Sequence, residues 1–104
     1  MPIRVTYRQD ANQGEIMDAL RSLGWYVENT ARVGAAAIPG FPDLMLVWPG
    51  SPEIWALVEV KMPGNEKRLT KDERAFCERV PKKVEIVSTV DDCIELTRRY
   101  TSGR

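Results

Sequence analysis

The chain contains no histidine among its 104 residues. This absence excludes Ser-His and Cys-His nucleophilic catalysis, histidine general bases and nearly all zinc-site geometries. Any catalytic chemistry must therefore come from carboxylates, lysine or tyrosine.

Cysteine is scarce as well. The two cysteines, Cys77 and Cys93, lie far apart, form no CxxC pair and follow no apolar signal segment. This pattern predicts a reduced, cytoplasmic setting in which both are buried small apolar residues. The longest apolar runs are far too short to cross a bilayer, so no membrane association is expected.

Neither sign of charge is in excess, because fifteen basic residues balance fifteen acidic ones. The chain therefore has no global positive field to hold a polyanion, and any contact with nucleic acid must be local. A nuclease that gathers carboxylates around divalent ions fits this balance, since the metals supply positive charge.

The composition, 43% hydrophobic and 29% charged, predicts one compact domain over residues 1–104, without repeats or a linker. A domain of this size buries a modest share of its surface. We therefore expect it to be helped by bound metal, by bound substrate or by dimerisation, and we expect a homodimer.

Apolar periodicity predicts an α/β fold with the element order αβββαβα. Helical spacing places Ile16 and Leu20 on one helix face, and two apolar runs joined by a tight turn predict buried neighbouring strands. This order favours a central mixed sheet flanked by helices. The expected elements are a helix over 10–23, strands over 25–29, 43–48, 54–61 and 84–87, a helix after Thr70, and a helix opened by residues 88–89.

The second helix has a clear start signal. Thr70 and Glu73 have the spacing of a capping box, a role that accounts for Glu73. Apolar residues then follow at helical spacing in both later helices. Those expected to point inward are Phe76, Cys77 and Val80 in the second helix and Val90, Cys93, Ile94 and Leu96 in the last.

Three charged residues stand at the ends of the central apolar runs. Asp43 opens one strand directly after the turn at 40–42, where its side chain can project into a cleft at the sheet edge. Glu59 and Lys61 close the next strand, and strand alternation puts them on one face with Val60 on the other.

This set of residues suits phosphodiester hydrolysis. The reaction requires a divalent cation, and Mg²⁺ prefers carboxylate and carbonyl oxygens, which Asp43, Glu59 and the Val60 carbonyl could supply. Lys61 could position the attacking water or stabilise the developing charge. The alternative is that Asp43 caps the turn and that Glu59 and Lys61 form a solvated pair on an edge strand.

The sequence around these residues resembles a known nuclease family. Pro42-Asp43 in GFPDLMLV, followed by Glu59-Val60-Lys61 in ALVEVK, resembles the PD-(D/E)XK motif. The segments RQDANQGEIMDALRSLGW, ARVGAAAIPGFPD and LTKDERAF further resemble compact VRR-NUC-type proteins, which are common in phages and prophages and related to Holliday junction resolvases. The resemblance covers almost the whole chain and implies a restriction-endonuclease-like αβββαβ core.

The resemblance also implies roles for individual residues. Asp43 and Glu59 would bind Mg²⁺ or Mn²⁺, and Lys61 would be the catalytic lysine. The family often adds an acidic or amide residue from the first helix. Gln13 is the candidate because the helical period places it on the Ile16 face, although it could instead cap the helix start. Resolvase-like relatives tend to have Glu there, so Asp10 and Glu15 remain alternatives.

The implied activity is that of a metal-dependent DNA endonuclease, selective for branched or Holliday-junction DNA, working as a homodimer without an organic cofactor. For a phage-encoded protein the setting would be the bacterial host cytoplasm. The other possibility is a catalytically silent module that binds DNA or forms complexes. DNA phosphates beside the cleft could be held by loop residues Arg32, Lys67, Arg68 and Lys71, unless these are simply solvated.

In relatives of the VRR-NUC type, a Gln often occupies the second helix near the position of Glu73. The capping role explains Glu73 in this sequence, so it is not assigned to the site.

Overall fold

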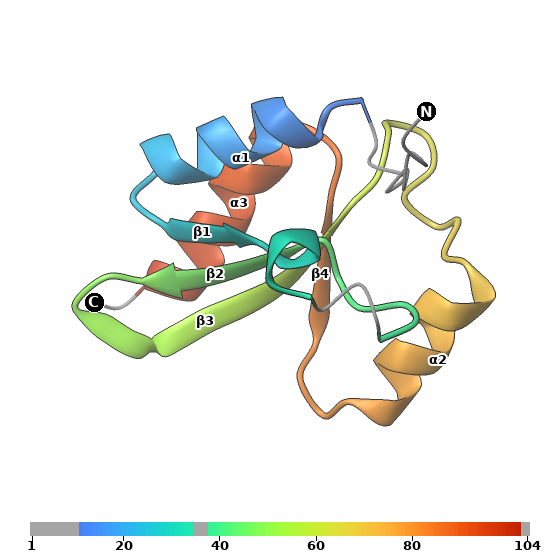
Figure 1. Ribbon diagram of the computed structural model, residues 1–104. Helices are drawn as coiled ribbons and strands as arrows, with labels where there is room; N and C mark the ends of the chain where they lie inside the picture. The colour runs from blue at the N-terminus through green and yellow to red at the C-terminus, as the bar shows by residue number, and fades with distance from the viewer. Residues whose placement is uncertain (1–10, 35–37, 103–104) are drawn as a thin grey trace, which may run out of the picture.

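The chain forms an α/β structure with one four-stranded mixed sheet and three α-helices (Figure 1). The computed structural model describes residues 11–34 and 38–102. The predicted order αβββαβα is confirmed, with one unpredicted 3-10 helix, η1, after the first strand. The elements are α1 (Gln13–Ser22), β1 (Tyr26–Asn29), η1 (Thr30–Val33), β2 (Leu44–Trp48), β3 (Ser51–Val60), α2 (Lys71–Arg79), β4 (Val84–Val87) and α3 (Val90–Thr101).

The sheet has the order β1-β2-β3-β4, with β3 antiparallel to β2 and parallel to β4. β3 is therefore an internal strand, and the edge-strand alternative for Glu59 and Lys61 is wrong. β3 also begins at Ser51, earlier than the expected residue 54. A register irregularity between Val47 and Trp48 lets Trp48 pair with Ser51 and extends the hairpin to its turn.

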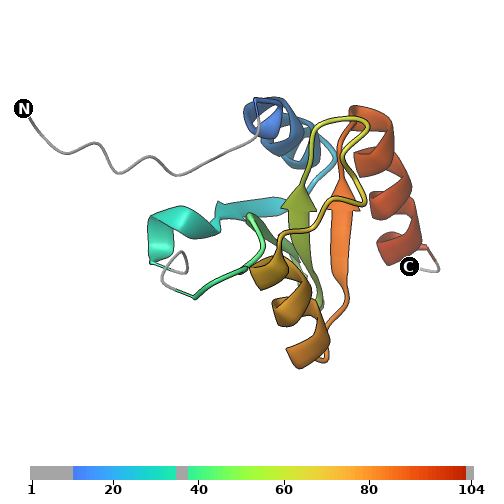
Figure 2. The same ribbon diagram turned by 90° about the vertical axis from the view of Figure 1, so that its right-hand side faces the viewer.

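The two faces of the sheet have different partners. α1 and α3 lie on one side of β4 and α2 lies on the other (Figures 1 and 2). Ala56, Val58 and Val60 of β3 belong to the core under α1 and α3. Strand alternation turns Leu57 and Glu59 toward the α2 face. The buried core consists of Ile16, Leu20, Trp25, Val27, Leu44, Leu46, Ala56, Val58, Val60, Val87, Cys93 and Leu96.

Some expectations for the helices were wrong in detail. α1 begins at Gln13 after the N-cap Asn12, rather than at Asp10, which lies outside the described residues. Val90 and Ile94 are each 39% exposed, because Cys93 and Leu96 form the buried stripe of α3. In the described part of the chain, no helix is both long and apolar enough to cross a membrane.

Cys77 is only partly buried, whereas Cys93 is fully buried as predicted. The reason is that α2 is short and buries mainly Phe76, whose ring meets the ring of Phe41 edge-on at 5.2 Å. Phe41 belongs to the loop that leads into β2, so this aromatic pair ties α2 to the loop that carries Asp43.

The loop before Asp43 packs directly on the first turn of α2. Gly40 has φ +78°, and a Cβ placed on it would overlap the backbone carbonyl of Asp72. Only glycine can adopt this conformation at such a close approach. Gly40 therefore fixes the distance between the Asp43 loop and the helix that carries Glu73.

Gly40→Ala is expected to lower the free energy of unfolding by about 3 kcal/mol, because a left-handed alanine and a backbone overlap both add cost. Gly64→Ala is the matched control, since Gly64 also has positive φ but nothing lies within 4 Å of its added Cβ. The control should lose only about 1 kcal/mol. Urea denaturation measures both, and equal losses would contradict the close packing.

Candidate functional site

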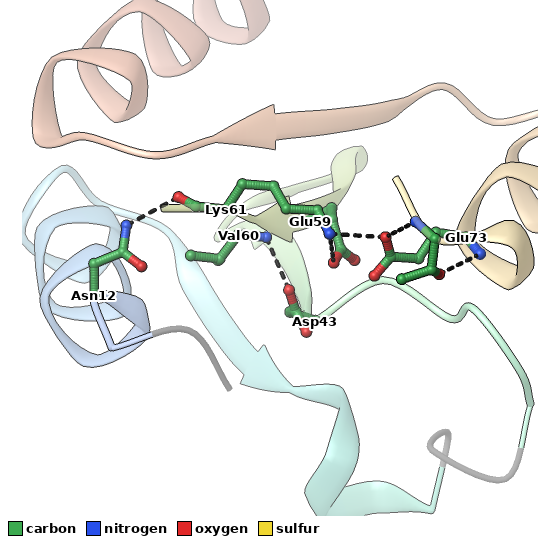
Figure 3. A network of polar contacts seen from close by, with 7 residues as sticks. Asn12, Asp43, Glu59, Val60, Lys61 and Glu73 are labelled. Carbon is green, nitrogen blue, oxygen red and sulfur yellow. Dashed lines mark hydrogen bonds and ion pairs between the residues drawn. The ribbon is translucent and has the colours of Figure 1, made fainter. Parts of the chain in front are cut away.

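The register between β2 and β3 places Asp43 opposite Glu59. Leu44 pairs with Val58 in this antiparallel ladder. Continuing the register by one residue sets Asp43 across from Glu59 on the same face of the sheet, the arrangement in which side chains of neighbouring strands meet. The two carboxylates predicted from separate strands thus lie side by side, with Lys61 next to them (Figure 3).

Asp43 is held in place by its backbone and its side chain. Its carboxylate oxygen Oδ2 accepts a hydrogen bond from the Val60 amide at 2.8 Å. Its backbone oxygen accepts from the Thr30 amide at 3.0 Å and from Thr30 Oγ1 at 2.9 Å. The N–H and C=O of a strand residue point to the same edge, so the Val60 carbonyl lies on the Asp43 side, as the predicted ligand set requires.

Lys61 is buried beside two carboxylates. Its ammonium Nζ lies 2.8 Å from Glu73 Oε1 and 3.6 Å from Glu59 Oε2. Glu59 is 5% exposed and Lys61 is 9% exposed. The alternative of a solvated pair is therefore wrong, and these charges lie inside the fold.

Glu73 also belongs to the candidate site, although its spacing from Thr70 predicted only a role in the helix cap. The capping box is confirmed, because Glu73 Oε1 accepts from the Thr70 amide at 2.8 Å and Thr70 Oγ1 accepts from the Glu73 amide at 3.1 Å. The same oxygen also accepts from Lys61. The one signal in the sequence was its resemblance to VRR-NUC-type proteins, in which a Gln often lies near this position of the second helix. The capping pattern alone could not reveal the contact between Glu73 and Lys61.

Glu59 and Glu73 differ in their ionisation. Burial, helped by a hydrogen bond to Glu73 and by the charge of Asp43, raises the pKa of Glu59 from 4.5 to about 10. Burial opposes ionisation of Glu73 too, but hydrogen bonds from Glu59 and Lys61 hold its pKa below the ordinary value. In the absence of a cation, one proton is thus held on Glu59, and the site carries less negative charge than its residue types suggest.

The start of α1 reaches the end of β3. Asn12 Nδ2 donates to the backbone oxygens of Lys61 at 3.1 Å and Ser88 at 2.8 Å. Gln13, the next residue, is 2% exposed and lies on the buried face with Ile16, as predicted. Its Oε1 is buried without a hydrogen-bond partner in the described structure. Glu15, an alternative to Gln13, is exposed.

The four basic residues expected around the cleft are all exposed. Two of them lie in helices rather than loops, because Arg32 belongs to η1 and Lys71 opens α2. Lys67 and Arg68 lie in the segment between β3 and α2, as predicted.

The donor set fits a hard divalent cation. Within residues 11–34 and 38–102, no group of three or more acidic or cysteine side chains gathers closely enough to hold a metal by itself. The two carboxylates of Asp43 and Glu59 would need other oxygens, and the Val60 carbonyl and the orphaned amide oxygen of Gln13 are of the kind that Mg²⁺ prefers. A cation would also replace the proton on Glu59.

Comparison of the chain with models of protein families, with curated proteins and with solved structures found no match.

Glu59→Gln is expected to stabilise the protein in EDTA at about pH 8, with a gain that shrinks toward about pH 4. Between 4.5 and about 10, the unfolded chain has released the Glu59 proton while the folded chain holds it, so rising pH favours unfolding. Glutamine has no proton to release in this range, so the stability of the variant no longer depends on pH through residue 59. The control is Glu78→Gln on the exposed side of α2. Denaturation across this pH range measures both, and a Glu59→Gln variant that follows wild type throughout would contradict a protonated Glu59.

Proposed function

We propose that this chain is a metal-dependent DNA endonuclease of the PD-(D/E)XK type, similar to compact VRR-NUC proteins. The observation that carries the proposal is the register that sets Asp43 opposite Glu59, with Lys61 directly after the internal strand β3 and its ammonium 3.6 Å from Glu59. The element order αβββαβ and the mixed sheet are compatible with the core expected of that family.

A divalent cation, Mg²⁺ or Mn²⁺, held by Asp43, Glu59 and the Val60 carbonyl would neutralise charge at the phosphodiester and make water more acidic. Lys61 would stabilise the negative charge that develops on the phosphoryl oxygens. Glu73 is a positioning residue, because its hydrogen bond fixes the Lys61 ammonium next to Glu59. The buried Gln13 amide offers a further oxygen from α1.

The substrate in this proposal is DNA, with branched or Holliday-junction DNA favoured by the sequence resemblance. The balanced charge of the chain requires local phosphate contacts, which the exposed Arg32, Lys67, Arg68 and Lys71 would provide. A homodimer would bring two such sites to a symmetric junction. No organic cofactor takes part.

One observation favours a second candidate, a catalytically silent DNA-binding or complex-forming module. Among the described residues, no three acidic side chains are arranged so that they could hold a metal ion, and the ammonium of Lys61 is already engaged by Glu73. A fold by itself does not guarantee an activity. The intact trio of Asp43, Glu59 and Lys61 nevertheless makes the enzyme the better explanation.

A cleavage assay separates the two candidates. Purified protein is incubated with labelled linear, single-stranded, flap and four-way-junction DNA in Mg²⁺, Mn²⁺ or EDTA. Wild type should cleave at least one substrate only with metal, and Lys61→Ala should lower the rate by at least about 100-fold, the scale of losing one transition-state charge partner.

Lys83→Ala is the matched control, because Lys83 is exposed in the turn before β4 and should keep wild-type activity. If pure wild type cleaves none of these substrates with either metal, or if Lys61→Ala cuts as fast as wild type, the proposed catalytic centre is wrong.

A further inference from the structure

A polar cavity of about 410 Å³ lies between α1 and the segment formed by β1 and η1. Two arginines from different elements line it, Arg21 near the end of α1 and Arg32 in η1. Cations in a surface cavity are suited to an anionic ligand. The full lining is Gly14, Met17, Arg21, Glu28, Asn29 and Arg32.

Both walls of this cavity are attached to the candidate catalytic centre. The wall formed by α1 begins after Asn12, whose amide donates to the backbone oxygen of Lys61. The opposite wall turns into η1 at Thr30, whose amide and hydroxyl donate to the backbone oxygen of Asp43. Figure 1 shows the N-terminal end of α1 and η1 at the same end of β1. The cavity therefore lies beside the centre and is held in a fixed position relative to it.

The charged groups of the cavity favour a phosphate backbone. Arg21 Nη2 donates to the backbone oxygen of Val27 at 3.3 Å, which fixes its guanidinium across β1. A guanidinium has five donors and matches phosphate oxygens well, so this bond leaves it able to bind an anion. Glu28 accepts from the Tyr26 hydroxyl and reduces the positive charge of the cavity without cancelling it.

The length of the cavity suits a nucleic-acid strand. Gly14 and Arg21 are seven residues apart on α1, which corresponds to about 10 Å along the helix axis. A duplex strand advances about 3.4 Å per nucleotide along the helix axis, so about three nucleotides fit beside this wall. Gly14 has no side chain, and nothing lies within 4 Å of a Cβ placed there, so the wall stays open at the end nearest the centre.

We infer that this cavity is a DNA-backbone subsite, in which Arg32 and, farther along α1, Arg21 hold phosphates of the strand whose scissile phosphate would lie at Asp43 and Glu59. The inference rests on the proposed nuclease function and identifies the side of the centre along which the strand runs. Glu28, the one carboxylate in the lining, weakens the subsite.

Fluorescence anisotropy with labelled double-stranded DNA in EDTA tests the subsite without cleavage. Arg21→Gln and Arg32→Gln should each weaken binding about tenfold, as expected for a hydrogen bond to a charged group. Each should also lower the salt slope of binding by about 0.9. Glu28→Gln should tighten binding. Arg98→Gln is the control, because Arg98 is exposed on α3, pairs with Glu95 and loses the same charge.

The outcomes distinguish this subsite from the nuclease itself. If both arginine variants bind like Arg98→Gln, or if wild type does not bind DNA, the subsite is wrong, whatever the cleavage assay shows. If both variants lose affinity while pure wild type cleaves no DNA, the subsite stands and the nuclease proposal fails. Thermal unfolding of each variant checks that a loss of binding is not a loss of fold.

Discussion

The hydrogen bond from the Val60 amide to the Asp43 carboxylate joins the start of β2 to the end of β3. This bond continues the antiparallel pairing of β2 and β3, and the register of that pairing determines both the core and the candidate site. A slip of β3 by one residue would turn Glu59 away from the face that carries Asp43, and it would take Val58 and Val60 out of the core under α1 and α3. The hydrophobic core therefore specifies the register that brings the two carboxylates together.

The α2 face of the sheet buries two ionisable side chains, Glu59 and Lys61, beside the half-buried Glu73, and their burial has no simple explanation in stability. Ion pairs inside a protein gain little over apolar residues of similar size, because desolvation opposes their attraction. Glu59, Lys61 and Glu73 nevertheless occupy the α2 face of the sheet, with Glu59 kept protonated mainly by burial. Strongly shifted groups of this kind are typical of functional sites, which supports the proposed catalytic centre. The contact between Gly40 and the first turn of α2 keeps Glu73 within reach of Lys61.

Local patterns predicted much of this structure. Apolar periodicity gave the order of helices and strands, and strand alternation correctly put Glu59 and Lys61 on one face. Glu73 was missed as a site residue because its contact with Lys61 depends on where α2 packs, which no local pattern encodes. The exposure of Val90 and Ile94 and the short helix η1 also depend on tertiary packing, since helical spacing alone does not tell which turns reach the sheet.

We propose that Asp43 and Glu59 form one cation site across two strands. Titration calorimetry with Mn²⁺ tests this site directly and needs no substrate. Wild type should bind Mn²⁺ saturably with release of a proton, seen as a heat that depends on the buffer, and Asp43→Ala should lose this binding. An absence of Mn²⁺ binding to wild type, or equal binding to Asp43→Ala, would contradict it.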